Sequence, residues 1–487
     1  RQAALKHTEN YDAVVVGSGP NGLSAAITLA RQGLKVLVIE AAEKIGGGSR
    51  TAEATLPGFL HDTCSSVHPL AVSSRFFKSL ELEKYGVEWK YSPVSLAHPL
   101  DGQPSVLAYR SLDQTAESIG ADGPAYRQLM QPLLSRWDEL LHEIMRPLRI
   151  PDDPFTLAGF GLLAINSAAG LANRRFREER AKALFAGMAG HSMLPLTRFA
   201  SASFGLILGL SAHAVGWPVA VGGSQTIVDA LYAILRSLGG EVVTGWKIKS
   251  LNELPPARAL LMDISPRQLL EIAGDELTGL YRRQLARFRY GPGVFKVDWA
   301  LDGPIPWRDE QVLQASTVHL GGTLAEIARS EQSVWQGEHA QKPFVLLVQS
   351  SLADPSRAPV EKHTAWAYCH VPAGSTRDMR QPIEAQIERF APGFRDRILA
   401  VHATNAQQYE QYNPNYIGGD INAGVQDFWQ FAARPVLRWN PYSTSRKGLY
   451  LCSSSTPPGG GVHGMSGYLA AKSALKNVFG IRYSLEE

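Results

Sequence analysis

Three glycines and one acid lie at a spacing that suits a phosphate-binding turn. Gly17, Gly19 and Gly22 form a GxGxxG pattern, and Glu40 follows 23 residues after Gly17. The first glycine permits a tight turn, the second lets a pyrophosphate approach the backbone, and the third lets a helix pack closely on a strand. Glu40 is placed to accept hydrogen bonds from a ribose diol. The pattern predicts dinucleotide binding.

A strand and a helix are expected on either side of this turn. Residues 11–16 are short and rich in valine, as in a buried strand. Residues 23–31 are small and apolar, as in a helix, and 34–39 form a second apolar strand. Free N–H groups and a positive dipole end at the helix start attract phosphates. The residues expected to contact the dinucleotide here are Gly17, Gly19, Pro20, Asn21, Gly22, Glu40 and Ala41.

A second glycine group follows the acid directly, within the sequence KIGGGSRT over 44–51. This continuation resembles FAD-binding flavoproteins of the amine oxidase and carotenoid desaturase superfamily. The resemblance implies FAD as the cofactor, with Gly47, Gly48, Ser49 and Arg50 added to its site. No second GxGxxG directly follows an expected strand, so one dinucleotide is expected and no separate NAD(P)H domain. The absence of a CxxxxC pair excludes a lipoyl-type disulfide reductase.

The C-terminal region carries a strand over 448–452, a loop rich in Ser, Pro and Gly, and a helix over 468–478. It resembles the closing signature of phytoene dehydrogenase-related flavoproteins. In that group the loop passes beneath the isoalloxazine ring, and the helix start stabilises charge on the reduced flavin. The resemblance implies that Ser454, Gly461, Val462 and Met465 contact FAD. Relatives often have Gly-Asp or Gly-Ala where this chain has Ser453-Ser454, so a serine hydroxyl replaces any aspartate contact.

The middle of the chain extends the resemblance. A glycine-rich loop over 216–225 precedes an expected helix over 226–238 and a strand from 239, and Ile248 is implied to lie near the adenine. The usual β-hairpin is reduced to residues 252–258. The implied fold is α/β, a Rossmann-like FAD-binding domain of the glutathione reductase type with an interleaved α+β substrate domain. The implied boundaries are 8–75, 215–285 and 440–480 for FAD, with 76–214 and 286–439 for substrate.

Several polar residues compete for catalytic roles. His61 and Asp62 form a candidate acid/base pair, with a surface or capping pair as the alternative. His463 lies inside the flavin loop and is a candidate to stabilise reduced flavin or donate a proton. Asp420 and Asn422 lie in a turn-rich loop that the related group often places near the ring.

One aromatic residue and three histidines complete the candidates. Trp217 is a candidate aromatic wall, with a core tryptophan as the rival. We expect His319, His363 and His370 to be solvated or satisfied strand histidines without a catalytic role.

Composition excludes several classes of protein. The 487 residues include 45 Gly and only 19% charged residues, with a net charge of +3, so a disordered tail protein and a small disulfide scaffold are excluded. Two or three folding units are expected. Scattered Lys and Arg argue against nucleic acid binding. The three cysteines form neither a disulfide framework nor a zinc pattern, and no metal site is expected.

Two long stretches of the sequence, 155–172 and 199–228, contain no Asp, Glu, Lys or Arg. We expect them to form buried or cavity-lining helices, with peripheral membrane contact through an apolar face as the alternative. The polar segment 1–11 lacks an apolar signal core and is expected to be a disordered lead-in, which favours a cytoplasmic location.

The prediction is an FAD-dependent oxidoreductase that desaturates or oxidises a polyene, isoprenoid or other lipid-like substrate by hydride transfer to flavin N5. Oxygen, a quinone or another partner would accept the electrons. Two rivals remain open: a flavin-dependent isomerase or saturase without net oxidation, and a flavin-binding scaffold without catalysis.

Overall fold

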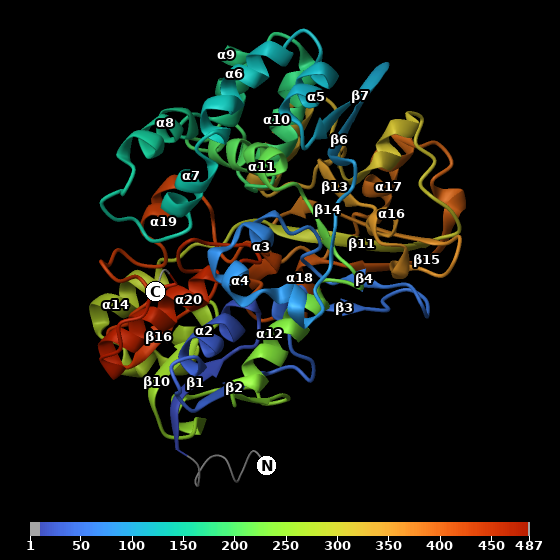
Figure 1. Cartoon of the computed structure of the whole chain (residues 1–487). Helices are drawn as coiled ribbons and strands as arrows, with labels where there is room; N and C mark the ends of the chain where they lie inside the picture. Colours follow the sequence, from blue (N-terminus) through green and yellow to red (C-terminus); the bar gives the residue numbers. More distant parts are fainter. Residues whose placement is uncertain (1–9, 486–487) are drawn as a thin grey trace.

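A five-stranded parallel sheet forms the base of the molecule in the computed structural model, which describes residues 10–485 (Figure 1). Its order is β16-β10-β1-β2-β9. Its strands are nearly continuous apolar runs because both faces are covered. The strands are β1 (Tyr11–Val16), β2 (Val36–Ile39), β9 (Glu241–Val243), β10 (Ala257–Met262) and β16 (Leu449–Leu451).

Helices cover both faces of this sheet. On one face α2 packs between α12 and α20, with small residues such as Ala25, Ala26 and Ala471 in a shared core. On the other face α13 and α14 bury Leu269 and Leu285 against the strands. The helices are α2 (Pro20–Ala30), α12 (Gln225–Ser237), α13 (Pro266–Ala273), α14 (Gly279–Ala286) and α20 (Met465–Ala474).

A seven-stranded sheet lies above the parallel sheet (Figure 1), in the order β15-β11-β14-β13-β12-β6-β7. Its pairs are antiparallel except for β6 with β12. One face packs on α17 (Arg380–Phe390) through Ile383 and Ile387. The strands are β6 (Val94–Leu100), β7 (Gln103–Tyr109), β11 (Gly293–Leu301), β12 (Ala315–Leu320), β13 (Val345–Val348), β14 (His363–Val371) and β15 (Ile398–Thr404).

A helical layer occupies the upper left of the molecule in Figure 1 and carries most of the two uncharged stretches. Residues 155–172 fall in α8, α9 and the turn between them, and residues 199–228 include α11. The expectation of buried or cavity-lining helices is wrong for α8, because Phe155 and Leu162 are exposed, whereas Leu208 of α11 lines a cavity. In the described part of the chain no single helix has the length and hydropathy to cross a bilayer, and α8 with α9 meets that test only as a pair bent by 92°. The layer consists of α5 (Leu112–Ile119), α6 (Gly123–Leu134), α7 (Trp137–Ile144), α8 (Pro154–Ala164), α9 (Ala168–Arg175), α10 (Glu179–Gly190) and α11 (Ala202–Ala214).

Short elements connect these layers. They are β3 (Thr51–Ala52), β4 (His61–Asp62), α3 (Pro69–Ser73), α4 (Arg75–Leu80), β5 (Trp89–Lys90), β8 (Val219–Ala220), α15 (Leu324–Trp335), α16 (Ser350–Ala353), α18 (Ala406–Tyr412) and α19 (Phe428–Ala432).

The α/β Rossmann-like architecture expected from the sequence is confirmed. The first helix begins at Pro20, three residues earlier than expected, because proline suits the first turn of a helix. No hairpin lies between β9 and β10: within these described residues only a 3₁₀ turn, Leu251–Glu253, has regular structure, in line with the loss of the usual hairpin. The strand expected to end near Ile248 is shorter, because β9 ends at Val243. The disordered lead-in expected over residues 1–11 falls almost wholly outside the described residues, and Tyr11 begins β1.

Candidate functional site

A cavity of about 600 Å³ runs between the parallel sheet, the seven-stranded sheet and the helical layer. Its lining joins segments that are far apart in the sequence, from Val16 at the end of β1 to Val462 before α20. One end is built from the turns after the parallel strands, and we call it the cofactor end. The other end is walled by side chains of α11, β12, β13 and β14, and we call it the substrate end.

Close backbone approach defines the cofactor end. A Cβ added to Gly17 would lie 2.8 Å from the carbonyl oxygen of Asp263, and one added to Gly19 would lie 3.0 Å from the Asp263 carboxylate. A Cβ on Gly47 would lie 3.1 Å from the Gly19 Cα. These three glycines form a cradle of bare backbone at the start of α2, where no side chain caps the helix. Such a cradle fits a pyrophosphate.

Glu40 is held in place at the end of β2 by four donors. Its Oε2 accepts hydrogen bonds from the Ser18 N–H at 3.0 Å and the Ser18 hydroxyl at 2.5 Å. Its Oε1 accepts from the Ala42 N–H at 2.8 Å and from Arg50 Nη2 at 3.3 Å. Glu40 and Arg50 both line the cavity. The carboxylate is therefore oriented in advance for a ribose diol, with a guanidinium beside it.

Most residues that the sequence assigned to the cofactor lie together at this end. The cavity lining includes Gly17, Gly19, Pro20, Asn21, Glu40, Ala41, Gly47, Gly48, Ser49, Arg50, Ile248, Ser454, Gly461 and Val462. Ser454 accepts a hydrogen bond from Asn21 Nδ2 at 3.2 Å, which ties the C-terminal loop to the start of α2. Two segments more than 400 residues apart thus meet in one site.

Gly22 and Met465 lie outside the cavity lining. A Cβ on Gly22 would lie 2.1 Å from the Gly17 carbonyl oxygen, so Gly22 serves the packing of α2 against the turn. The Met465 N–H donates to His463 Nδ1 at 3.0 Å and points into its own loop.

Asp263 lines the cofactor end and was missed by the sequence reasoning. Its Oδ2 accepts a hydrogen bond from the Gly22 N–H at 2.9 Å. Burial raises the pKa of the Asp263 carboxyl to about 7. The hydrogen bond from Gly22 opposes this rise, and the negative charge of Glu40 adds to it. The available signal was an acid directly after an apolar strand, the same signal that identified Glu40.

Aromatic side chains wall the substrate end. Trp366 and Tyr368 of β14 stack with ring centroids 5.6 Å apart and planes 9° from parallel. Trp217 lies against His191, and its indole N–H donates to the Ser211 hydroxyl at 3.0 Å. Trp217 lines the cavity and is also part of the buried core, so its position is compatible with both roles that the sequence suggested. Aliphatic residues complete this end: Leu208, Leu346 and Val348.

A histidine pair is the main polar feature of the substrate end. His191, on the cavity lining, lies with its Nε2 2.8 Å from the Nε2 of His319 on β12. Burial lowers the pKa of His191 to about 3 and that of His319 well below its ordinary value. Both rings are neutral at physiological pH, and one shares its N–H with the other.

No sequence pattern pointed to His191, and the sequence analysis assigned no catalytic role to His319. The Nδ1 atom of His319 is buried without a hydrogen-bond partner, so His319 is not the satisfied strand histidine that we expected. His370 bonds to Glu331 at 2.6 Å through Nδ1, while its Nε2 has no partner. His363 bonds to the Ser351 hydroxyl at 3.1 Å. Within residues 10–485 no cluster of three or more His, Cys, Asp and Glu is arranged to hold a metal.

The structure does not bring His61 and Asp62 together as a pair facing the cavity. They are neighbours on β4, so their side chains point to opposite faces. Asp62 is fully buried and forms an ion pair with Arg357 at 2.9 Å. It also accepts from the Ser66 hydroxyl and the Ser224 N–H. Although burial opposes it, this set of donors lowers the pKa of the Asp62 carboxyl.

His61 bonds to the Thr55 hydroxyl at 2.8 Å, and its Nδ1 lies 3.5 Å from Asp298. Burial lowers the pKa of His61 to about 4, although the charge of Asp298 opposes this. His61 and Asp62 thus hold the β3–β4 pair against β11 and the start of α12.

Of the remaining candidate catalytic residues, one lines the cavity and two lie behind the lining. Asn422 lines the cavity, whereas Asp420 lies behind it and accepts N–H bonds from Gly291, Asn422 and Gly424. His463 is buried, with Nε2 3.0 Å from the Gly459 carbonyl oxygen. With the Met465 N–H on its other nitrogen, His463 clamps the loop that carries Gly461 and Val462. Burial lowers the pKa of His463 to about 4, so the clamp is neutral.

Sequence comparison agrees with this geometry. Residues 15–80 match the model of the NAD(P)-binding Rossmann-like domain. The chain is 24% identical to the rat protein called pyridine nucleotide-disulfide oxidoreductase domain-containing protein 2, over 96% of this chain and 94% of that protein. It is 23% identical to an uncharacterized protein of Mycobacterium tuberculosis, over 96% of this chain and 98% of that one.

Solved structures share the fold at low sequence identity. An oxidoreductase from Methanosarcina mazei superposes with a TM-score of 0.65 at 16% identity, covering 96% of this chain and 100% of that chain. A putrescine oxidase variant gives 0.65 at 16% identity, covering 97% and 99%. Cyclohexylamine oxidase from Brevibacterium oxydans gives 0.61 at 16% identity, with the same coverage. The solved structures show a shared fold, and the family model shows a dinucleotide-binding domain over residues 15–80. Neither comparison singles out the phytoene dehydrogenase-related group.

Proposed function

We propose that the chain is an FAD-dependent oxidoreductase that desaturates or oxidises an uncharged, hydrophobic substrate. The observation that carries this proposal is the cavity itself, with a dinucleotide cradle at one end and an aromatic wall at the other. The fold comparisons support the oxidoreductase class, and the lining of the substrate end supports the substrate class.

FAD fits the residues at the cofactor end. The bare backbone at Gly17, Gly19 and Gly47 would receive the pyrophosphate, and the fixed carboxylate of Glu40 would receive a ribose diol. Arg50 would balance phosphate charge beside them. When bound, FAD supplies the hydride acceptor, while the protein orients the substrate and excludes water.

Charge at the substrate end argues for a neutral substrate. Among the described residues that line the cavity, the carboxylates are Glu40 and Asp263, and both belong to the cofactor end. The Lys296 ammonium already lies 5.2 Å from the centre of the Trp366 ring. A cationic substrate would therefore meet aromatic rings without a carboxylate to pair its charge.

The neutral histidine pair gives this end one directed polar contact. Because His191 shares a hydrogen bond with His319, its ring orientation is fixed while its edge faces the cavity. A neutral imidazole donates to, or accepts from, an uncharged polar group without paying for a buried ion. We therefore propose a substrate with a long apolar body and one hydroxyl, carbonyl or similar group. His191 would hold that group and fix which carbon approaches the flavin.

Amine oxidation is the second candidate function. The structural neighbours named putrescine oxidase and cyclohexylamine oxidase favour it at the level of fold. The stacked pair of Trp366 and Tyr368 is a surface that also suits an amine in its neutral form. Isomerisation or saturation with reduced FAD, and a scaffold role, are the further outcomes that the experiment below separates.

The test is anaerobic reduction of the flavin in the purified holoprotein. We expect fractionated lipid extracts to bleach the flavin and amines such as putrescine and cyclohexylamine to leave it oxidised. Bleaching by amines alone would replace the proposal with amine oxidation. Turnover of a lipid only after prior reduction, with no net oxidation, would identify an isomerase or saturase. A flavin that no extract bleaches, before or after reduction, would identify a scaffold.

A further inference from the structure

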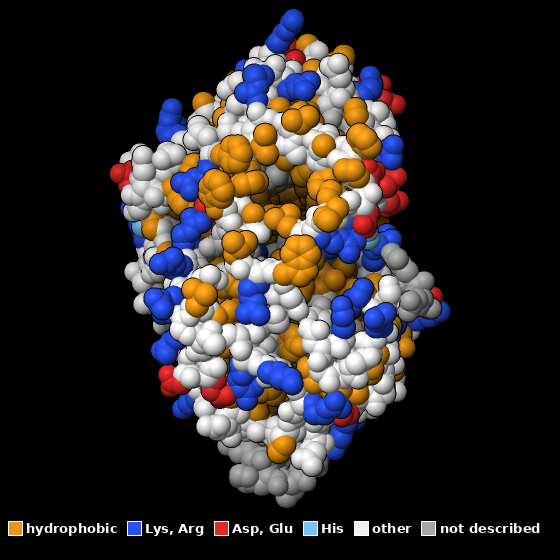
Figure 2. Space-filling view, turned by 90° about the vertical axis from the view of Figure 1, so that its left-hand side faces the viewer, with side chains coloured by type: hydrophobic (Ala, Val, Ile, Leu, Met, Phe, Trp, Pro, Cys, Tyr) orange, Lys and Arg blue, Asp and Glu red, His pale blue; other side chains and the backbone are white. Residues whose placement is uncertain are grey.

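Large apolar side chains are exposed on one face of the molecule, on the side that carries α8 and α19 (Figure 2). Figure 2 shows these side chains around a hollow in that face. Phe155 at the start of α8 is 88% exposed and Trp439 is 90% exposed, values that are rare for such residues outside an interface. We call this set the apolar rim: Phe155, Leu162, Ile165, Phe199, Phe428, Trp429, Leu437 and Trp439.

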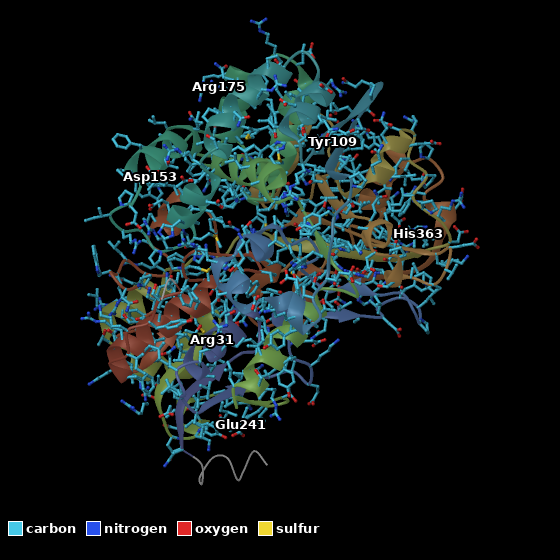
Figure 3. All side chains as sticks on the ribbon, viewed as in Figure 1. Arg31, Tyr109, Asp153, Arg175, Glu241 and His363 are labelled. Carbon is cyan, nitrogen blue, oxygen red and sulfur yellow. The ribbon has the colours of Figure 1, made fainter. Side chains whose placement is uncertain are left out.

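Contacts between separate segments join the parts of the rim that come from α8, Phe199 and α19. The rings of Phe199 and Phe428 meet edge to face with centroids 5.3 Å apart, and Phe428 makes the same contact with Trp429. The Ala200 N–H donates to the Ile165 carbonyl oxygen at 2.9 Å, which joins the segment of Phe199 to the end of α8. Three segments that are distant in the sequence therefore present one surface. Figure 3 labels Asp153, the residue before α8, at the left edge of the molecule, on this face.

A basic helix borders the rim. The segment 279–289, which contains α14, carries four exposed arginines and no acid: Arg282, Arg283, Arg287 and Arg289. Arg289 binds Asp427 at 2.8 Å, directly before α19. Arg438, between Leu437 and Trp439, lies 5.4 Å from the centre of the Tyr281 ring of α14. Apolar and cationic side chains thus belong to one connected face, and Figure 2 shows Lys and Arg side chains beside the orange rim.

We infer that this face binds the surface of an anionic phospholipid bilayer. Exposed Phe, Leu and Trp side chains enter the boundary between headgroups and acyl chains, where tryptophan is preferred. The arginines of α14 pair with lipid phosphates beside it. No helix of the rim needs to span the bilayer for this mode of binding.

Two features favour a bilayer over a second protein. The rim surrounds a hollow, as Figure 2 shows, and does not form one flat patch. A protein partner that bound the rim would have to span this hollow. The cationic segment has no acid of its own. Arg282 lies 3.5 Å from the exposed Asp275, and Arg289 pairs with Asp427. Four arginines thus meet two acids, so the segment keeps an excess of positive charge that suits an anionic surface. The inference does not depend on the proposed activity, because it uses no residue of the cavity lining.

The test measures binding of the holoprotein to vesicles by co-sedimentation. We expect binding to equimolar phosphatidylcholine–phosphatidylglycerol vesicles, weaker binding to phosphatidylcholine alone, and loss of the difference at high salt. Phe155→Ser with Trp439→Ser should weaken binding by about tenfold or more, because both lose apolar contact with lipid. Arg282→Ala with Arg283→Ala should weaken binding to the anionic vesicles by about thirtyfold, since each arginine near the surface contributes about 1 kcal/mol.

Matched controls lie away from this face. Val360 is 91% exposed and lies near His363, at the opposite side of the molecule in Figure 3. Arg397 precedes Ile398, which pairs with Leu301 at the same end of the sheet as His363. Val360→Ser and Arg397→Ala should bind as the unaltered protein does. The rim variants should keep their thermal midpoints, because these side chains are already exposed. Equal binding by the rim variants and the unaltered protein would overturn the inference. Failure of the unaltered protein to sediment with either kind of vesicle would also overturn the inference. If the protein were then found to be a dimer that Phe155→Ser dissociates, the face would be assigned to self-association.

Discussion

The two ends of the cavity are built from different materials. The cofactor end consists of backbone turns after parallel strands, where Gly17 leaves no room for a side chain and Gly19 and Gly47 leave little. The substrate end consists of side chains such as Trp217, Trp366 and His191, which come from three separate parts of the chain. Substitutions at the glycines of the cofactor end are therefore expected to abolish cofactor binding. Single substitutions at the substrate end are expected to alter which substrates bind. Four predictions follow from this contrast.

The largest effect is expected at the cofactor end, from Gly19→Asp. A Cβ at this position would lie 3.0 Å from the Asp263 carboxylate, and the new carboxylate would repel both Asp263 and the pyrophosphate. We expect complete loss of bound flavin, measured by absorbance of the purified protein. Gly279→Asp is the matched control, because the nearest atom to its Cβ is 4.0 Å away. A normal flavin spectrum in Gly19→Asp would remove the N-terminal turn from the cofactor site.

A pH effect on stability is expected next, also at the cofactor end. The pKa of Asp263 is raised to about 7 in the folded protein, above the value of about 3.9 for an unfolded aspartate. The folded state therefore binds this proton more tightly, and its stability falls as the pH rises from about 4 to about 7. The slope is at most about 1.4 kcal/mol per pH unit.

Thermal midpoints of the flavin-free protein across this range measure the effect. Asp263→Asn should flatten the slope, and Asp275→Asn, at an exposed position, should leave it in place. An unchanged slope in Asp263→Asn would show that Asp263 titrates normally.

A smaller effect is expected at the substrate end, from His191→Leu. This change removes one directed hydrogen bond and keeps an apolar wall, so the flavin should stay bound. We expect the rate of flavin reduction by the active lipid fraction to fall about tenfold, a loss typical of one hydrogen bond. His319→Leu should act in the same direction by freeing the ring of His191. The control His363→Leu should be reduced at the normal rate. If His191→Leu and His319→Leu were also reduced at the normal rate, the histidine pair would have no role in the reaction.

The smallest effect is expected between the two ends, from His463→Ala. The ring clamps the loop that carries Gly461 and Val462 by two hydrogen bonds to backbone. We expect flavin to stay bound with its dissociation constant raised several-fold, and the rates of reduction or reoxidation to change. His402→Ala, at an exposed position on β15, is the control. Unchanged affinity and unchanged half-reaction rates would limit His463 to a packing role.

Two candidate catalytic residues that do not line the cavity, Asp62 and Asp420, show what sequence reasoning could not predict. Asp62 looked like a catalytic carboxylate, but Arg357, 295 residues away, forms an ion pair with it in the interior. Asp420 looked like a ring contact, but it holds three N–H groups of nearby loops. A single residue type does not reveal which partner the fold will bring to it, so a buried structural acid and a catalytic acid look the same in sequence.

The sequence by itself determined the parallel sheet and the dinucleotide turn, and most of the residues that it assigned to the cofactor line the cavity. These depend on local backbone geometry, which glycine spacing and apolar runs report directly: Gly17, Gly19 and Glu40 lie within one strand–helix–strand unit. The tertiary structure alone decided the rest. His191 and His319 meet across 128 residues, and the rim joins α8 to α19. Such sites depend on which faces pack together, and long-range packing leaves no fixed spacing in the chain.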